Sequence, residues 1–161
     1  RTRPFSEILR DSCVGLLMGR CQRTGCEKET TVFRHLVNKP TVYSLVVVFG
    51  SGAASKEELS RTLAAVDDEL DVAQIYTADP TSRTDLPPRR AVLKHITAFA
   101  LAHYVAFTWS DLAGEWLLRD DTMCRRVGPT FEHVKAKCVA NRYQPGLLFY
   151  EAQPVLPVTR T

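Results

Sequence analysis

One histidine and two aspartates are spaced so that they can act as a base and its orienting partner. His103 opens a strand-like run, and Asp120 and Asp121 end the next such run, with a turn-rich segment at 111–114 between them. In an antiparallel hairpin the start of one strand lies beside the end of the other, so His103 and Asp120 can meet if one bulge is allowed. A carboxylate bonded to one imidazole nitrogen fixes the tautomer and raises the basicity of the other. The spacing therefore predicts the base-and-orienter half of a nucleophilic triad, although many hairpins place a histidine near an aspartate.

The remaining histidines lack such neighbours. His35 and His95 lie in strand-like runs, and His133 lies in a helical pattern. We interpret all of them as packed or surface residues rather than catalytic ones.

The cysteines argue against a disulfide framework. Their number is odd and their spacing sparse, which favours reduced thiols in the cytosol, the nucleus or an organelle matrix over secretion. Cys138 falls on the buried face of a helical pattern and is interpreted as a small core residue. The cysteines are Cys13, Cys21, Cys26, Cys124 and Cys138.

Length and composition indicate one folded domain over residues 1–161. Apolar residues make up 45% and charged residues 24% of the chain, which suits a globular core. The net charge of +3 and the isolated basic pairs at 89–90 and 125–126 argue against nucleic-acid binding. The longest apolar run, 42–49, falls far short of the roughly 18 residues of a membrane span, and no secretory signal is recognisable.

Hydrophobic periodicity supplies the elements that would position these residues. The apolar run at 41–49 predicts a central strand covered on both faces. A capping-box pattern at Ser55 and Glu58 predicts the start of a helix. Segment 78–90 is predicted to be an exposed loop and 152–161 a tail. The order indicates an α+β fold with a mostly antiparallel sheet and flanking helices. Further helices are expected at 5–18 and after Pro129, and further strands at 30–37, 71–77, 92–101, 103–110, 115–119, 122–127 and 146–151.

The C-terminal motifs resemble those of a known family. Residues 102–107 read Ala-His-Tyr-Val-Ala-Phe, followed by Trp116 after the turn and then by the aspartate pair. This order is similar to the His box of ubiquitin-specific proteases, and the run Leu-Leu-Phe-Tyr at 147–150 is similar to their last strand. The resemblance implies the papain-like fold of that family. This chain would be the palm and fingers portion, from the C-terminal part of the catalytic domain in a divergent or pseudoenzyme branch.

The resemblance also implies roles for individual residues. His103 would be the general base, Asp120 its orienting partner and Asp121 a neighbouring acid that helps to arrange the site. Trp116 and Tyr104 would be packing residues.

Segment 18–30 resembles a remnant of the family's zinc-ribbon fingers. Within it, Cys21 and Cys26 would supply at most one pair of the four ligands that a closed structural zinc site needs. No other cofactor is expected.

The nucleophile is missing from the pattern. No Asn-x-Cys box is found, and Cys13 lies in a helix-like stretch just before the fingers remnant, which is the wrong place. Two smaller departures are Ala102, where the family commonly has glycine, and Arg119, where it has an aromatic residue. Neither removes the expected contact between His103 and Asp120.

Three functions follow as alternatives. With a catalytic cysteine upstream, the chain would belong to an enzyme that removes ubiquitin by thiol chemistry. Without one, it would be an inactive scaffold or protein-binding module in a larger assembly, with ubiquitin or another protein as partner. The third alternative is an unrelated α+β domain with a chance hairpin.

Overall fold

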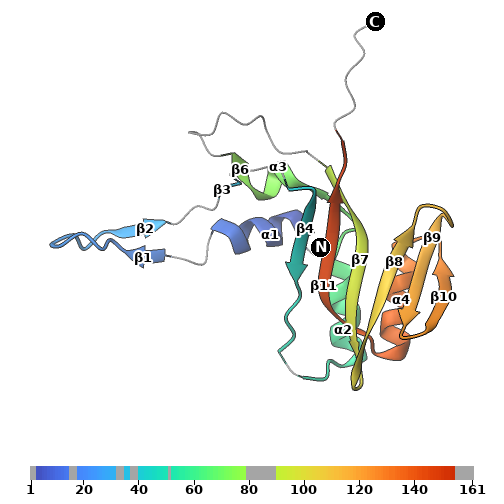
Figure 1. Cartoon of the computed structure of the whole chain (residues 1–161). Helices are drawn as coiled ribbons and strands as arrows, with labels where there is room; N and C mark the ends of the chain where they lie inside the picture. The colour runs from blue at the N-terminus through green and yellow to red at the C-terminus, as the bar shows by residue number, and fades with distance from the viewer. Residues whose placement is uncertain are drawn as a thin grey trace, which may run out of the picture.

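A central antiparallel sheet organises the chain in the computed structural model. The structure describes residues 3–14, 18–31, 35–36, 40–50, 52–78 and 90–154. Within these residues, six strands form one continuous path and a seventh pairs with its fourth strand (Figure 1). In order across the sheet they are β10 (Met123–Gly128), β9 (Glu115–Asp120), β8 (His103–Ser110), β7 (Arg90–Ala100), β11 (Gln144–Ala152) and β4 (Val42–Val46), and β5 (Glu69–Asp71) pairs with β7.

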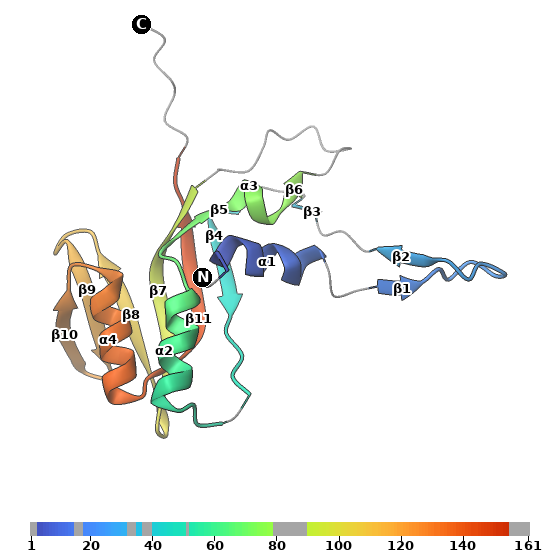
Figure 2. The ribbon, with the colours of Figure 1, turned by 180° about the vertical axis from the view of Figure 1, so that it is seen from behind.

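The helices gather on one face of this sheet, as the view from behind shows (Figure 2). They are α1 (Phe5–Val14), α2 (Lys56–Ala65), the short α3 (Val72–Ile75) and α4 (Phe131–Asn141). Away from the sheet, β1 (Met18–Arg20) and β2 (Glu29–Thr31) form a projecting hairpin, and β3 (His35–Leu36) pairs in parallel with β6 (Thr77–Ala78). The predicted α+β fold with a mostly antiparallel sheet and flanking helices is confirmed. Among the helices of the described residues, none combines the length and apolarity needed to cross a bilayer.

The strand registers separate a core face from an open face. On the face covered by helices, Leu148, Ile96, Phe107 and Leu118 stand side by side on successive strands, and each is at most 4% exposed. One residue further along each strand, the side chains point to the opposite face. There the row consists of Ser44, Phe149, His95, Thr108, Leu117 and Arg126, all of them half-buried or exposed.

Local sequence signals explain how α2 and α4 begin and pack. The Ser55 hydroxyl accepts a hydrogen bond from the Glu58 N–H at 3.1 Å, as the capping pattern predicts. Leu59 and Leu63 then lie buried against the core. In α4 the buried face consists of Phe131, Val134 and Cys138, so the prediction of Cys138 as a core residue is confirmed.

Two strand predictions are wrong. Segment 41–49 does not lie in the centre of the sheet, because β4 is an edge strand and Val46 is 71% exposed. Within segment 71–77, Val72–Ile75 form α3 rather than a strand, because the Asp71 carboxylate accepts a hydrogen bond from the Ala73 N–H at 3.1 Å and caps a helical turn; only Asp71, at the end of β5, and Thr77, at the start of β6, are strand residues.

Several predicted boundaries shift. The helix predicted over 5–18 ends at Val14, and Met18 already belongs to β1. The run 30–37 contains the end of β2 and the whole of β3, while its residues 32–34 and 37 lie outside the described residues. Ala78 and Arg90 lie in strands, while 79–89 of the predicted loop and 155–161 of the predicted tail lie outside the described residues.

Candidate functional site

The β8–β9 hairpin brings His103 and Asp120 together. The ladder between these strands runs without a register shift from Ser110 opposite Glu115 to Ala106 opposite Arg119. If this register is continued by one residue, Val105 lies opposite Asp120. His103, two residues before Val105, is then the diagonal neighbour of Asp120 on the same face, within reach of its side chain. The His103 Nε2 atom lies 3.0 Å from the Asp120 Oδ1 atom. The contact predicted from the spacing is therefore present, and it needs no bulge.

This geometry assigns different tasks to the two imidazole nitrogens. An ionised carboxylate only accepts hydrogen bonds, so Nε2 must carry the proton that it shares with Asp120. In the neutral ring Nδ1 is then the acceptor, and it is the atom that could take a proton from a nucleophile. The His103 side chain is 48% exposed and that of Asp120 is 24% exposed. The imidazole is thus oriented from one side and accessible from the other.

Two tight turns border this pair. Ala100 pairs with His103, so only Leu101 and Ala102 connect β7 to β8, and Leu101 has the left-handed φ of 57°. Asp121 begins the turn after β9, where it is exposed and has a φ of 48°. Among the described residues, none forms a hydrogen bond or ion pair with Asp121, so its role in arranging the site stays a prediction.

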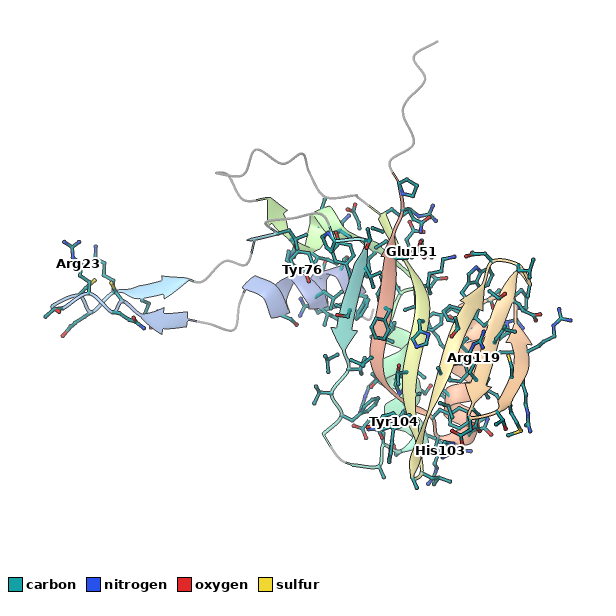
Figure 3. All side chains as sticks on the ribbon, viewed as in Figure 1. Arg23, Tyr76, His103, Tyr104, Arg119 and Glu151 are labelled. Atoms are coloured by element: carbon teal, nitrogen blue, oxygen red, sulfur yellow. The ribbon has the colours of Figure 1, made fainter. Side chains whose placement is uncertain are left out.

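Aromatic residues support the hairpin. Trp116 is 3% exposed and packs against Trp109 and Phe131, with ring centroids 6.0 and 6.1 Å away. Tyr104 is 67% exposed, and its ring meets the edge of Phe99 at 5.3 Å. Trp116 is thus a core residue, whereas Tyr104 lies on the surface next to His103 (Figure 3).

Comparisons with known proteins connect this fold to a family. No protein-family model matches the chain. Ubiquitin carboxyl-terminal hydrolase 54 of Mus musculus is 24% identical over 96% of the chain, and ubiquitin carboxyl-terminal hydrolase 53 of Homo sapiens is 25% identical over 91%. The chain spans only 9% and 13% of these two relatives.

Solved structures show the same relationship at the level of the fold. A variant of the SAGA Ubp8/Sgf11/Sus1/Sgf73 DUB module matches 96% of the chain at 18% identity, with a TM-score of 0.58, and the chain spans 34% of that protein. The module bound to monoubiquitin matches with a TM-score of 0.55 at 16% identity. The match covers 96% of this chain and 34% of that one. The Saccharomyces cerevisiae PAN2 pseudoubiquitin-hydrolase-RNase module matches with a TM-score of 0.52 at 13% identity. The match covers 96% of this chain and 27% of that one.

The chain has the fold of the C-terminal portion of a ubiquitin-specific protease domain. The His103–Asp120 pair belongs to this ubiquitin-specific protease-like fold as a feature of its β8–β9 hairpin. The catalytic roles of the two residues stay predictions.

The cysteines of this chain lie in several separate places. Cys138 is fully buried in α4, and this burial raises the pKa of its thiol to about 12, which makes it a poor nucleophile. Cys124 is exposed on the edge strand β10, and Cys21 and Cys26 belong to the β1–β2 hairpin. Among the thiols that the structure describes, none is hydrogen-bonded to His103. Cys13 lies in α1, and its side chain is outside the described residues.

The projecting hairpin holds the predicted zinc ligands. The Cys21 N–H donates to the Lys28 carbonyl and the Cys26 N–H donates to the Arg23 carbonyl, both at 2.9 Å. Two thiols are half of a closed zinc site. Across the described part of the chain, no group of three or more potential metal ligands is assembled. A zinc ion at Cys21 and Cys26 therefore stays a prediction.

A polar cluster on the open face escaped the sequence analysis. His95 Nδ1 lies 3.0 Å from the Thr108 hydroxyl, and its ring meets the edge of Phe149 at 5.4 Å. Partial burial, and then the charge of Arg119, lower the pKa of His95, so the ring is neutral at pH 7. The signal that could have revealed the cluster was the alternation of His95, Thr97 and Phe99 with Ile96 and Ala98 along β7.

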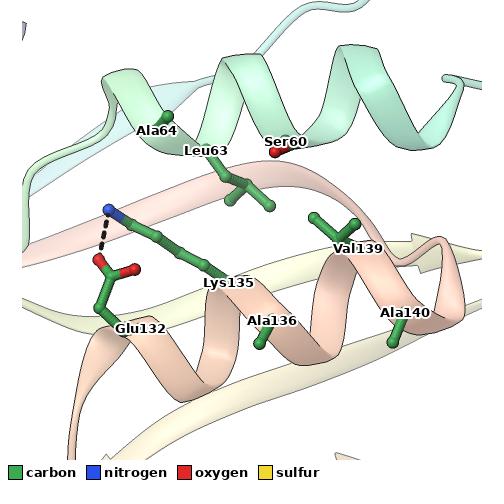
Figure 4. Close-up of a pocket in the computed structure, with 8 residues that line it drawn as sticks. All are labelled: Ser60, Leu63, Ala64, Glu132, Lys135, Ala136, Val139 and Ala140. Carbon is green, nitrogen blue, oxygen red and sulfur yellow. Dashed lines mark ion pairs between the residues drawn. The ribbon is translucent and has the colours of Figure 1, made fainter.

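A separate hollow of about 570 Å³ lies between α2 and α4 (Figure 4). Leu63 and Val139 form its apolar wall, and Lys135 pairs with Glu132 at 2.9 Å on its rim. Because neither His103 nor Asp120 lines it, this hollow is not part of the candidate site.

Proposed function

We propose that the chain is the base-bearing part of a ubiquitin carboxyl-terminal hydrolase-like domain that binds ubiquitin. Hydrolysis of the bond after ubiquitin's C-terminus would then depend on a cysteine supplied by another segment of the polypeptide. His103 would take the thiol proton and later return it to the leaving amine. Asp120 would hold the imidazole in the required tautomer.

The observation that carries this proposal is the oriented but accessible imidazole. The 3.0 Å contact to Asp120 engages Nε2, whereas His103 is still 48% exposed. A histidine that serves only packing would be buried, and one that serves only solubility would need no fixed partner. An oriented base at the open end of a hairpin fits proton transfer with a group that approaches from outside the chain.

His103 and Asp120 lie at the end of the sheet on the same face as Phe107 and Leu118, and the open face on the other side supplies a second surface for the bound protein. The exposed apolar residues of this open face are Val42 and Val46, at 50% and 71% exposed, beside the half-buried Phe149, and the helices of the described chain all lie on the other side. Exposed apolar side chains on a sheet face are typical of a surface that a partner covers. The related module that is bound to monoubiquitin supports ubiquitin as this partner.

The second candidate is a catalytically inactive scaffold or protein-binding module within a larger assembly. Two observations on the described residues support it. Cys138 is buried, and none of the described thiols is hydrogen-bonded to His103. The similarity to a module that carries the name pseudoubiquitin-hydrolase points the same way. An intracellular location suits both candidates, because the described cysteines are unpaired.

The test begins with binding. ¹⁵N-labelled ubiquitin is titrated with the 161-residue chain and followed by NMR, and binding is expected to shift ubiquitin resonances. Ubiquitin with a C-terminal electrophile is then incubated with the longest polypeptide that contains the chain. Labelling that is lost in His103→Ala but kept in His133→Gln would establish the hydrolase.

The other outcomes separate the alternatives. Binding of ubiquitin without labelling of any cysteine would favour the scaffold. Absence of both binding and labelling would refute the proposal.

A further inference from the structure

We infer that a hollow walled by aromatic rings binds an extended, proline-containing segment of a partner protein that carries one basic residue. The hollow has a volume of about 220 Å³ and lies at the end of β8 away from His103, where β7, β8 and β9 meet the start of α4. Neither His103 nor Asp120 lines it, so this site is separate from the one that the proposed function uses.

Three aromatic side chains form the walls of the hollow. Trp109 and Trp116 meet edge to face, with ring centroids 6.0 Å apart and planes at 69°, and Phe131 lies 6.1 Å from Trp116 at 40°. Trp116 and Phe131 are fixed in the core at 3% and 4% exposed, whereas Trp109 is only half-buried. Rings inclined to one another in this way leave a concave apolar surface that is already in place before a ligand binds.

The charges around the hollow leave one carboxylate unbalanced. The Lys94 ammonium is paired with Asp111 at 2.6 Å, and Arg90 is paired with Glu69 at 2.5 Å. Among the residues that the structure describes, none forms a hydrogen bond or ion pair with the carboxylate of Asp68, which is exposed and lines the hollow. A ligand with one positive charge would therefore complement this site.

The chemistry of the walls favours proline as the neighbour of that charge. A proline ring is apolar and has no N–H group, so it enters an apolar hollow without leaving a buried donor unpaired. Proline-rich segments are already extended before they bind, and they typically dock on grooves lined by aromatic residues. A basic residue beside the proline would pair with Asp68.

Fluorescence reports directly on this hollow, because Trp109 and Trp116 are the only tryptophans of the chain and both line it. The probe is the peptide acetyl-Ala-Pro-Pro-Val-Pro-Arg-amide, which contains no fluorescent side chain. Titrated into the 161-residue chain, it is expected to shift the emission, since it covers the half-buried Trp109, and to saturate with a Kd of about 0.1–1 mM. Peptides with glutamate in place of arginine, or with alanine in place of every proline, should bind about tenfold more weakly or worse.

Two variants with the same change of charge test where the peptide binds. Asp68→Lys places a cation in the hollow and should weaken binding about tenfold. Glu27→Lys makes the same change at an exposed position of the β1–β2 hairpin that does not line the hollow. At 0.15 M salt, where exposed charges more than about 8 Å apart are largely screened, Glu27→Lys should leave the Kd unchanged.

Three results would overturn the inference. The first is the absence of a saturable change in emission up to about 5 mM peptide. The second is equal affinity of the wild-type chain and Asp68→Lys, which would place the peptide elsewhere. The third is that the alanine peptide binds as tightly as the proline peptide, which would leave a site for a basic side chain alone. None of these measurements involves ubiquitin, so their outcome is independent of the proposed function.

Discussion

Replacing His103 with alanine distinguishes an accessible base from a residue that the fold requires. The substitution removes the imidazole and leaves Asp120 without its partner. Because the His103 side chain is 48% exposed, solvent can reach both the vacated space and the Asp120 carboxylate. We therefore expect folding to be retained and ubiquitin labelling of the longer polypeptide to be lost.

The expected change in stability follows from this exposure. A solvent-accessible pair at 3.0 Å contributes about 0–1 kcal/mol to the free energy of unfolding. In a domain of this size 1 kcal/mol corresponds to a Tm shift of about 2–4 °C. Phe107, on the same strand and fully buried, gives the contrast. Phe107→Ala should cost about 3–5 kcal/mol, since it empties a core site.

Urea unfolding of the wild-type chain and the two variants provides the measurement. The denaturation midpoint of His103→Ala should lie close to that of the wild type, and that of Phe107→Ala far below it, with similar slopes. A loss of about 3 kcal/mol or more in His103→Ala would show that the imidazole is part of the core. The assignment of His103 as an accessible base would then be wrong.

Three further predictions concern the surrounding structure. In Gly128→Ala the new Cβ atom would lie 2.6 Å from the His133 ring at a φ of 149°, so the free energy of unfolding should fall by about 1–3 kcal/mol, as a denaturant titration would show. Because the folded state lowers the pKa of His95, the unfolded chain binds more protons below about pH 6.5, and stability should decrease as pH falls from 7 to 5; the decrease should be smaller in His95→Gln when Tm is measured against pH. Tyr150→Phe removes the hydrogen bond that the buried hydroxyl donates to the Asp67 carbonyl at 2.7 Å and should cost about 1 kcal/mol in the same titration.

Sequence reasoning succeeded where local chemistry and short-range pairing determine the structure. The hairpin from His103 to Asp120 needs only strand alternation and a permissive Gly114, whose φ is 65°. The cap at Ser55 needs only a hydroxyl and the N–H group of Glu58. Both were predicted because the interacting groups are close in sequence.

The errors arose where one local preference overruled another. The run 71–77 contains β-branched and aromatic residues that favour a strand, but the Asp71 carboxylate caps the N–H of Ala73 and starts a helical turn. Capping depends on the direction of one side chain, which hydrophobic periodicity does not encode. The left-handed backbone of Leu101 was missed because leucine seldom adopts it.

The edge position of β4 shows what an apolar run does and does not predict. Val42, Val46 and Val48 belong to a stretch that reads as a buried strand, yet they are 50%, 71% and 84% exposed. An apolar run indicates that a surface is kept from water. It does not indicate whether the residues that bury this surface belong to the same chain. Val42 and Val46 point to the same face as Ser44, whose row continues to Phe149 and His95. The exposure of these two valines is therefore explained if the same face receives the bound protein, which is the surface that the proposed function assigns to ubiquitin.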